Sequence, residues 1–381
     1  MDRLIRTVLA IVVGVVAAMG VPREVGRELR WEVAWEHTLG SADGSSRGSS
    51  TISDPSAHVP LESSRRFSLI HAADGEPRAT GLKTEVFQAS PQALINQADD
   101  VPRWAVQSWD GDILQVVPRR GIPRLRGDTL LQFDNESKVY GDVVTSGEQW
   151  VVDLPQNATV YDVAVDATGT HWFAVGSIDG RVLITDGVGG REWVYSTDSS
   201  GDAGFTPTVY GIHIARVDQP TSEPGDAPAV YIIQGTSPQT VRRIELLEGG
   251  ETTAAVIGEI ADAHVGKRPQ TILGVRSDLL VAGARGGLFV ADLGADRSLT
   301  VPVAGLSGLL GVGQSRDRLV MVAATGYEGP LIIVGASDFS AIASWELDDP
   351  SLRVQVAGGG PVGDRLLVQD NDHVVGLEIS L

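Results

Sequence analysis

A group of residues recurs along this sequence every 43 to 46 positions, and this repeat restricts the fold more than any other feature. Gly75-Glu-Pro77 is matched by Gly121-Ile-Pro123, 46 residues later, and the same spacing separates Trp104 from the next tryptophan of the pattern. Gly147-Glu-Gln-Trp150 then recurs after 43 residues as Gly190-Arg-Glu-Trp193. A period of this length is typical of a four-stranded sheet, which cannot bury both of its faces alone and therefore stacks on its neighbours.

Within each repeat the apolar residues form short runs, which indicates strands separated by tight turns. The third repeat shows this most clearly, with predicted strands at Tyr161–Val165, His171–Ser177, Arg181–Thr185 and Glu192–Tyr195. Asp179-Gly180 lies between the second and third of these runs. Asp-Gly suits a two-residue hairpin because both turn positions need a positive φ.

The spacing predicts an all-β fold, a β-propeller over 66–381. Six blades are expected, at 66–109, 112–154, 158–198, 208–258, 269–303 and 309–348.

The C-terminal segment supplies only three further strands, at Val354–Val356, Arg365–Val368 and Val374–Ile379. The segment Trp31–His37 is a lone strand pattern near the other end of the chain. Placed fourth in the last blade, it would close the ring and cover an exposed sheet edge. This arrangement gives a seven-bladed propeller; six or eight blades remain alternatives, because the irregular repeat at 208–258 leaves a boundary open.

The first 22 residues differ from the remainder of the chain. Arg3 and Arg6 precede an uncharged, largely apolar run over 7–22, which predicts a hydrophobic helix serving as a signal peptide or an uncleaved membrane anchor. Either reading predicts an exported protein, anchored in the cytoplasmic membrane and facing the periplasm or cell exterior, or secreted if the leader is cleaved. Segment 23–40 is then a linker and the ring-closing strand, and 41–65 a flexible loop rich in Ser, Gly and Pro.

The motifs resemble those of known propeller repeats. The Gly-x-x-Trp ending at Trp150 and Trp193 is similar to the docking tryptophan of PQQ-like (quinoprotein-type) repeats. The hairpin Gly176–Val182 is similar to both PQQ-like and WD repeats. The resemblance covers 66–198 and fades beyond it. It implies a propeller in which Trp104, Trp150 and Trp193 dock neighbouring blades, and a scaffold of the cofactor-free type.

Composition excludes several kinds of chemistry. The chain has no cysteine, which excludes disulfides, thiol catalysis and Cys-based metal sites. A net charge of −19 argues against nucleic acid as a partner, because phosphate binding needs clustered Lys and Arg. The seven histidines are scattered without ligand spacing, and Asp370–His373 falls where a hairpin turn is expected. The sequence therefore predicts no metal, no cofactor and no catalytic residues.

These observations favour a non-enzymatic interaction scaffold in the cell envelope, tethered to the membrane by its N-terminal segment. The segments 219–228 and 41–64 are predicted to contact its protein partner. The alternative is a propeller enzyme, hydrolase- or lactonase-like or quinoprotein-like, with a small-molecule or sugar-derived substrate in its central channel, since such a site needs no local motif.

Overall fold

The structure is a computed structural model. It describes residues 30–39, 58–63, 66–82, 86–90, 93–97, 103–126, 128–134, 137–166, 169–196, 208–215, 227–235, 239–260, 271–276, 279–284, 287–292, 297–336, 342–358 and 363–380. Most of these residues form strands, and two short 3₁₀ helices, η2 (Gly187–Gly189) and η3 (Glu248–Gly250), lie in turns. Within the described residues no helix has the length and apolarity to cross a membrane. The predicted leader at 1–22 lies outside them.

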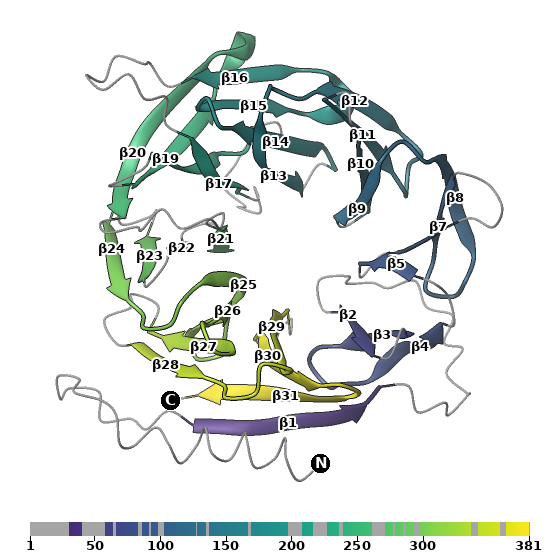
Figure 1. The fold of residues 1–381 in the computed structure, drawn as a ribbon, viewed down its shortest axis with the longest axis vertical. Coiled ribbons are helices and arrows are strands. Elements are labelled where there is room, and N and C mark those ends of the chain that lie inside the picture. The colour runs from purple at the N-terminus through teal and green to yellow at the C-terminus, as the bar shows by residue number, and fades with distance from the viewer. Residues whose placement is uncertain are drawn as a thin grey trace. The chain divides into compact units, whose positions relative to one another are not determined.

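The chain divides into two compact units, of which the first comprises Met1–Arg119 and Leu310–Leu381. Its sheets are antiparallel (Figure 1). They are β2(His58–Ser63)-β3(Arg66–His71)-β4(Pro77–Leu82); β5(Val86–Ala89)-β6(Leu94–Gln97)-β7(Arg103–Gln107)-β8(Ile113–Pro118); β25(Gly308–Gln314)-β26(Val320–Thr325)-β27(Pro330–Gly335)-β28(Ile342–Glu346); and β1(Arg30–Thr38)-β31(His373–Ser380)-β30(Arg365–Asp370)-β29(Arg353–Ala357).

The second unit, Arg120–Leu309, contains four four-stranded sheets in simple sequential order. They are β9(Ile122–Arg126)-β10(Thr129–Phe133)-β11(Lys138–Val143)-β12(Gln149–Asp153); β13(Ala158–Val165)-β14(His171–Ser177)-β15(Arg181–Thr185)-β16(Glu192–Ser196); β17(Val209–Ile214)-β18(Val230–Gln234)-β19(Gln239–Leu246)-β20(Thr252–Ile260); and β21(Thr271–Arg276)-β22(Leu279–Ala284)-β23(Gly287–Asp292)-β24(Arg297–Pro302).

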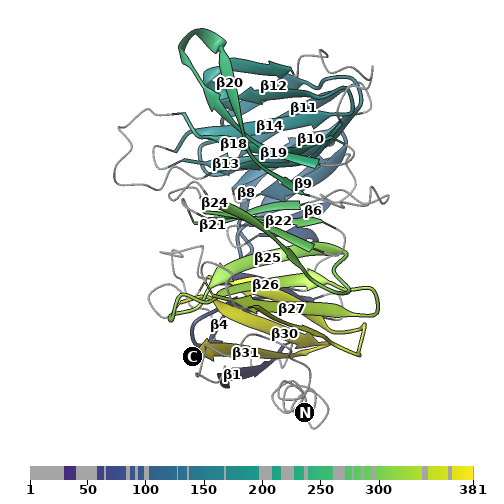
Figure 2. The same cartoon turned by 90° about the vertical axis from the view of Figure 1, so that its left-hand side faces the viewer.

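The N-terminal strand pairs with the C-terminal one, as the sequence predicted. β1 runs antiparallel to β31, with Trp31 opposite Ile379 and Trp35 opposite Gly376. A bulge between Val33 and Trp35 shifts the register by one residue. Figures 1 and 2 show the purple β1 along the yellow β31. The lone strand thus becomes the fourth strand of the C-terminal sheet, and β31 is no longer an exposed edge.

The predicted blade boundaries are confirmed from residue 158 onward and wrong before it. The segments 158–198, 208–258, 269–303 and 309–348 each match one four-stranded sheet. The segment 66–109, predicted as one blade, is instead divided between the sheets β2–β4 and β5–β8. The described residues therefore form eight sheets, where the sequence analysis favoured seven blades. The predicted loop at 41–65 also contains β2, and its other residues lie outside the described part.

Turn geometry shows why the early boundaries were misplaced. In the β3–β4 turn the amide of Gly75 donates to the carbonyl of His71, and in the β11–β12 turn Gly147 donates to Val143 in the same way. Both glycines have φ of +73°, a conformation that favours glycine. Gly75 and Gly147 therefore lie in the same kind of hairpin turn, whereas Gly121 lies between two sheets, so the equivalence of Gly75 to Gly121 suggested by the 46-residue spacing is wrong.

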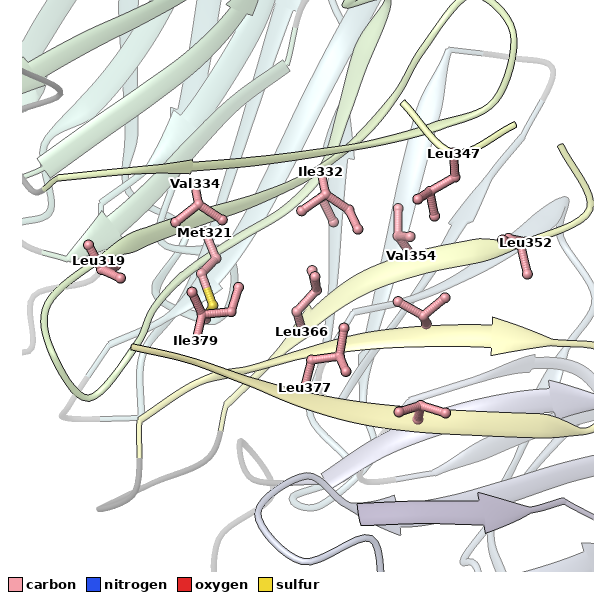
Figure 3. Close-up of a cluster of buried hydrophobic side chains, with 13 residues drawn as sticks. Leu319, Met321, Ile332, Val334, Leu347, Leu352, Val354, Leu366, Leu377 and Ile379 are labelled. Carbon is pink, nitrogen blue, oxygen red and sulfur yellow. The ribbon is translucent and has the colours of Figure 1, made fainter. Parts of the chain in front are cut away.

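Apolar side chains from neighbouring sheets meet in several buried clusters. Figure 3 shows one in the first unit, where Met321 and Val334 face Leu366 and Leu377 across two adjacent sheets. Each of these side chains is at most 2% exposed. Burying one such side chain contributes about 1.5–3 kcal/mol before entropic costs. Buried side chains alternate with exposed ones on the fourth strands β12 and β16, whereas every residue of the inner strand β14 is buried.

Candidate functional site

Two of the three predicted docking tryptophans make contacts between sheets. Trp150, on β12, packs against Phe173 of the next sheet with ring centroids 5.5 Å apart. Trp193, on β16, donates its indole N–H to the carbonyl oxygen of Leu247 at 2.8 Å, in the β19–β20 turn. Both occupy the fourth strand of their sheet, so their docking role is confirmed.

The equivalence predicted for Trp104 is wrong. This residue lies on β7, the third strand of its sheet, whereas Trp150 lies on a fourth strand. Its ring is buried and the guanidinium of Arg119 lies 5.0 Å from its centroid. The reason is that residues 66–118 belong to two sheets, β2–β4 and β5–β8. The 46-residue spacing assumed one sheet there, so it aligned strands that hold different positions in their sheets.

Trp35 docks in the manner that Trp104 was expected to. From β1 it donates its indole N–H to the carbonyl oxygen of Ala72 in the β3–β4 turn, at 2.8 Å. Its ring covers two glycines: a Cβ atom built on Gly75 would lie 2.5 Å from the ring, and one on Gly376 2.3 Å. The strand pattern of residues 31–37 predicted that Trp35 lies on the closing strand, but no local pattern predicted this contact.

One cluster in the second unit contains the three residue types of a nucleophilic triad. The hydroxyl of Thr129 lies 2.8 Å from Nδ1 of His171, and a carboxylate oxygen of Asp128 lies 3.8 Å from the same nitrogen. A catalytic triad needs the nucleophile and the carboxylate on opposite ring nitrogens. Thr129 is also fully buried. The cluster joins β10 to β14 of the next sheet, and its geometry gives no support to the enzyme alternative.

A second acid–histidine pair joins the sheet β13–β16 to the sheet β17–β20. Asp162 on β13 lies 3.3 Å from Nδ1 of His213 on β17. The same carboxylate oxygen accepts the backbone N–H of Ile214 at 2.9 Å, and the other accepts that of Val163. Both oxygens of this carboxylate thus bond to its own strand or to the neighbouring sheet, so the pair joins the first strands of two sheets.

The carboxylate of Asp142, in the second unit, is buried and its pKa is shifted. Burial raises its pKa above the ordinary value, against the opposing effects of hydrogen bonds from Gln132 and Gln149 and of the nearby Arg120. Gln149 donates to it at 2.5 Å and Gln132 at 3.4 Å. The Arg120 guanidinium itself lies 4.3 Å from the Tyr140 ring centroid. A perturbed pKa marks a functional candidate only where a ligand has access, and Asp142 is 1% exposed.

The sequence also predicted two turns, the absence of a metal site and two partner segments. Asn371, with φ of +54°, lies in the predicted β30–β31 turn. A turn also forms at Asp179-Gly180, but of these two residues only Gly180 has a positive φ, at +78°, and the turn includes Ile178, so the predicted two-residue form is wrong. No group of three or more His, Asp or Glu side chains in the described part of the chain could hold a metal ion. The predicted partner segments 41–64 and 219–228 lie outside the described residues except for β2 and the last two positions, 227–228.

Exposed apolar side chains gather on the fourth strands of the sheets. Val151 and Val194 each follow a docking tryptophan directly and are 53% and 55% exposed, because successive side chains of a strand point to opposite faces. We call the exposed apolar residues of these strands the fourth-strand residues: Val33, Ile113, Leu114 and Val116 in the first unit, and Val151, Val194, Val256 and Leu299 in the second.

No protein family and no curated protein matches the sequence of this chain. Solved structures do resemble its fold. Sqt1 from Saccharomyces cerevisiae, a WD40 protein, is 11% identical, with a TM-score of 0.54 over 85% of this chain and 93% of Sqt1. The computationally designed Ika8 protein is 14% identical, with a TM-score of 0.51 over 86% of this chain and 97% of Ika8.

BamB from Moraxella catarrhalis is 11% identical and aligns over 92% of this chain and 100% of its own, with a TM-score of 0.48. The likeness to Sqt1 and Ika8, at this low identity, concerns the fold and nothing finer. Together with the run of antiparallel four-stranded sheets, it shows that the chain has a β-propeller-type fold.

Proposed function

We propose that this protein is a non-enzymatic interaction scaffold, whose sheets present the fourth-strand residues to protein partners. The observation that supports this proposal is that the polar side chains make contacts between sheets, while apolar side chains face solvent. The Thr129–His171 hydrogen bond and the Asp162–His213 pair join neighbouring sheets, whereas apolar side chains such as Val151 and Val194 remain exposed. Buried polar groups that satisfy one another stabilise a fold, while exposed apolar side chains provide contact area for partners.

The proposal includes an extracytoplasmic location with a membrane tether. Its support is the sequence alone: Arg3 and Arg6 before the apolar run over 7–22. We propose the segments 41–64 and 219–228 as further partner contacts on the same basis, since both are rich in Ser, Gly or Pro. Separation of membrane and soluble fractions, followed by protease treatment of intact cells, tests this location. A protein found only in the soluble cytoplasmic fraction contradicts it.

Capture of partners by the tagged full-length chain tests the scaffold function. The test variant combines Val151→Lys with Val194→Lys, which places a charge on two exposed apolar positions. Ser196→Lys is the matched control, because Ser196 is exposed on the same face of β16. We expect the double variant to lose its specifically captured proteins and the control to keep them, with the fold of both verified by circular dichroism. If the wild type, the double variant and Ser196→Lys capture the same proteins equally, the fourth-strand residues do not bind those partners.

The segment 219–228 is tested separately by deletion. Loss of the captured proteins would assign the contact to that segment, whereas unchanged capture would eliminate it. The two tests are independent, because the deletion leaves the fourth-strand residues intact.

A further inference from the structure

Strand β8 forms an unusual edge of its sheet. It pairs with β7 on one side and ends the sheet on the other (Figure 1). Its residues Ile113, Leu114 and Val116 are 63%, 47% and 45% exposed. Of the fourth strands that the structure describes, β8 alone contains no charged residue. Natural proteins protect open edges with charges because an uncharged apolar edge is a template for another strand.

The charges that flank β8 have opposite signs at its two ends. Asp110 and Asp112 precede the strand, and Arg119 follows it; all three side chains are exposed. The Arg119 guanidinium stands near the Trp104 ring of the adjacent strand. Pro118 has no N–H to donate and so ends the pairing before the basic residue is reached. The edge is therefore an apolar segment with an acidic end and a basic end.

The opposite charges at the two ends of β8 favour a partner strand with the same arrangement of charges. We propose that β8 pairs antiparallel with β8 of a second copy of this chain, forming a two-fold symmetric dimer. In that orientation the acidic end of each strand lies across the basic end of the other, whereas a parallel arrangement would bring like charges together. A two-fold interface uses the same patch on both subunits, which a self-complementary edge provides. The inference does not depend on the proposed scaffold function, since the chain can self-associate without binding other proteins.

The dimer is expected to be weak and dependent on protein concentration. One strand pair buries less than the ~1,200–2,000 Å² that stable complexes bury. Its affinity should fall with added salt, because the flanking charges are exposed and screened by ions.

Analytical ultracentrifugation of the full chain over a range of concentrations provides the first test. We expect Val116→Lys to weaken association roughly tenfold or more, because it places a like charge in both strands of the pair. Ser196→Lys, at an exposed position on β16, is the control and should leave it unchanged. Association that persists in Val116→Lys, as association through the N-terminal apolar segment would, overturns the proposal. So does a wild-type chain that is monomeric at every concentration.

A charge exchange tests the orientation. Asp112→Arg and Arg119→Asp should each weaken self-association roughly two- to thirtyfold, because each creates like-charged pairs at both ends of the interface. Mixing these two variants should restore dimers, since each chain then meets its complement at both ends. If the mixture associates no better than either variant alone, the antiparallel arrangement is wrong.

Discussion

The indole nitrogen of Trp35 lies 2.8 Å from the carbonyl oxygen of Ala72, and this hydrogen bond ties β1 to the β3–β4 turn. The same strand pairs with β31 along its backbone. β1 therefore links the C-terminal sheet to the sheet that follows β1 in sequence. Trp35 belongs to the apolar cluster with Leu61, Ile70 and Leu367, so the link is buried as well as hydrogen-bonded.

Removing the Trp35 ring should destabilise the first unit strongly. We expect Trp35→Ala to lower the free energy of unfolding by about 3–5 kcal/mol, the usual cost of deleting a buried aromatic side chain. Urea denaturation followed by circular dichroism measures this loss. Val33→Ala is the control: it removes an exposed side chain of the same strand and should change stability by less than about 0.5 kcal/mol. Equal effects of the two substitutions would show that Trp35 does not secure β1.

Gly75 and Gly147 form a natural pair for separating backbone strain from packing. Both have φ of +73°, but a Cβ on Gly75 would collide with the Trp35 ring, whereas one on Gly147 would meet nothing within 4 Å. Gly147→Ala should cost about 1–2 kcal/mol from the left-handed backbone alone. Gly75→Ala should cost about 1–3 kcal/mol more through the collision. That excess should disappear when Gly75→Ala is made in the Trp35→Ala chain, as measured by urea denaturation; a persistent excess would contradict the packing explanation.

Trp150 and Trp193 should respond differently to the same substitution. The Trp193 N–H bonds to Leu247, whereas the buried Trp150 N–H has no acceptor among the described residues. Phenylalanine removes the N–H from both with the same loss of volume. We expect Trp193→Phe to cost about 1–2 kcal/mol more than Trp150→Phe, because it leaves the Leu247 carbonyl without its donor. Thermal unfolding of the two variants gives the difference, and a larger loss for Trp150→Phe would contradict the assigned roles.

The buried Asp142 should make stability depend on pH. Because burial raises its pKa in the folded chain, the folded state holds this proton more tightly than the unfolded state does. Its contribution is therefore fully present below the ordinary carboxyl pKa and is lost as pH rises through the higher, folded-state pKa. Unfolding of the wild type and of Asp142→Asn across this range should show the wild type losing stability relative to the variant as pH rises.

Asp153→Asn provides the control for that experiment. It removes an equal charge from an exposed position on the adjacent strand, so it corrects for the general effect of charge. A wild type that gains stability over Asp142→Asn with rising pH would show that the hydrogen bonds from Gln132 and Gln149, and not burial, dominate the pKa of this carboxyl.

The sequence predicted the regular repeats well because their signals are local. Gly180 marks a hairpin because glycine tolerates the positive φ that it adopts there, and Trp193 marks the strand that docks on the next sheet. It did not predict the polar contacts between sheets: Thr129 and His171 are 42 residues apart, and no local pattern indicates that they meet. The docking role of Trp35 was missed for the same reason, since its acceptor, Ala72, lies 37 residues away.

By itself the sequence determined where strands alternate, where the chain must turn and which segment near the N-terminus would pair with the C-terminal sheet. These are consequences of side-chain periodicity and backbone φ, which act within a few residues. The tertiary structure alone decided that 66–109 belongs to two sheets, that Trp104 lies on a third strand, and that the Asp142 carboxyl is buried. Those outcomes depend on which strands exchange backbone hydrogen bonds across long sequence separations, and a local pattern does not encode that choice.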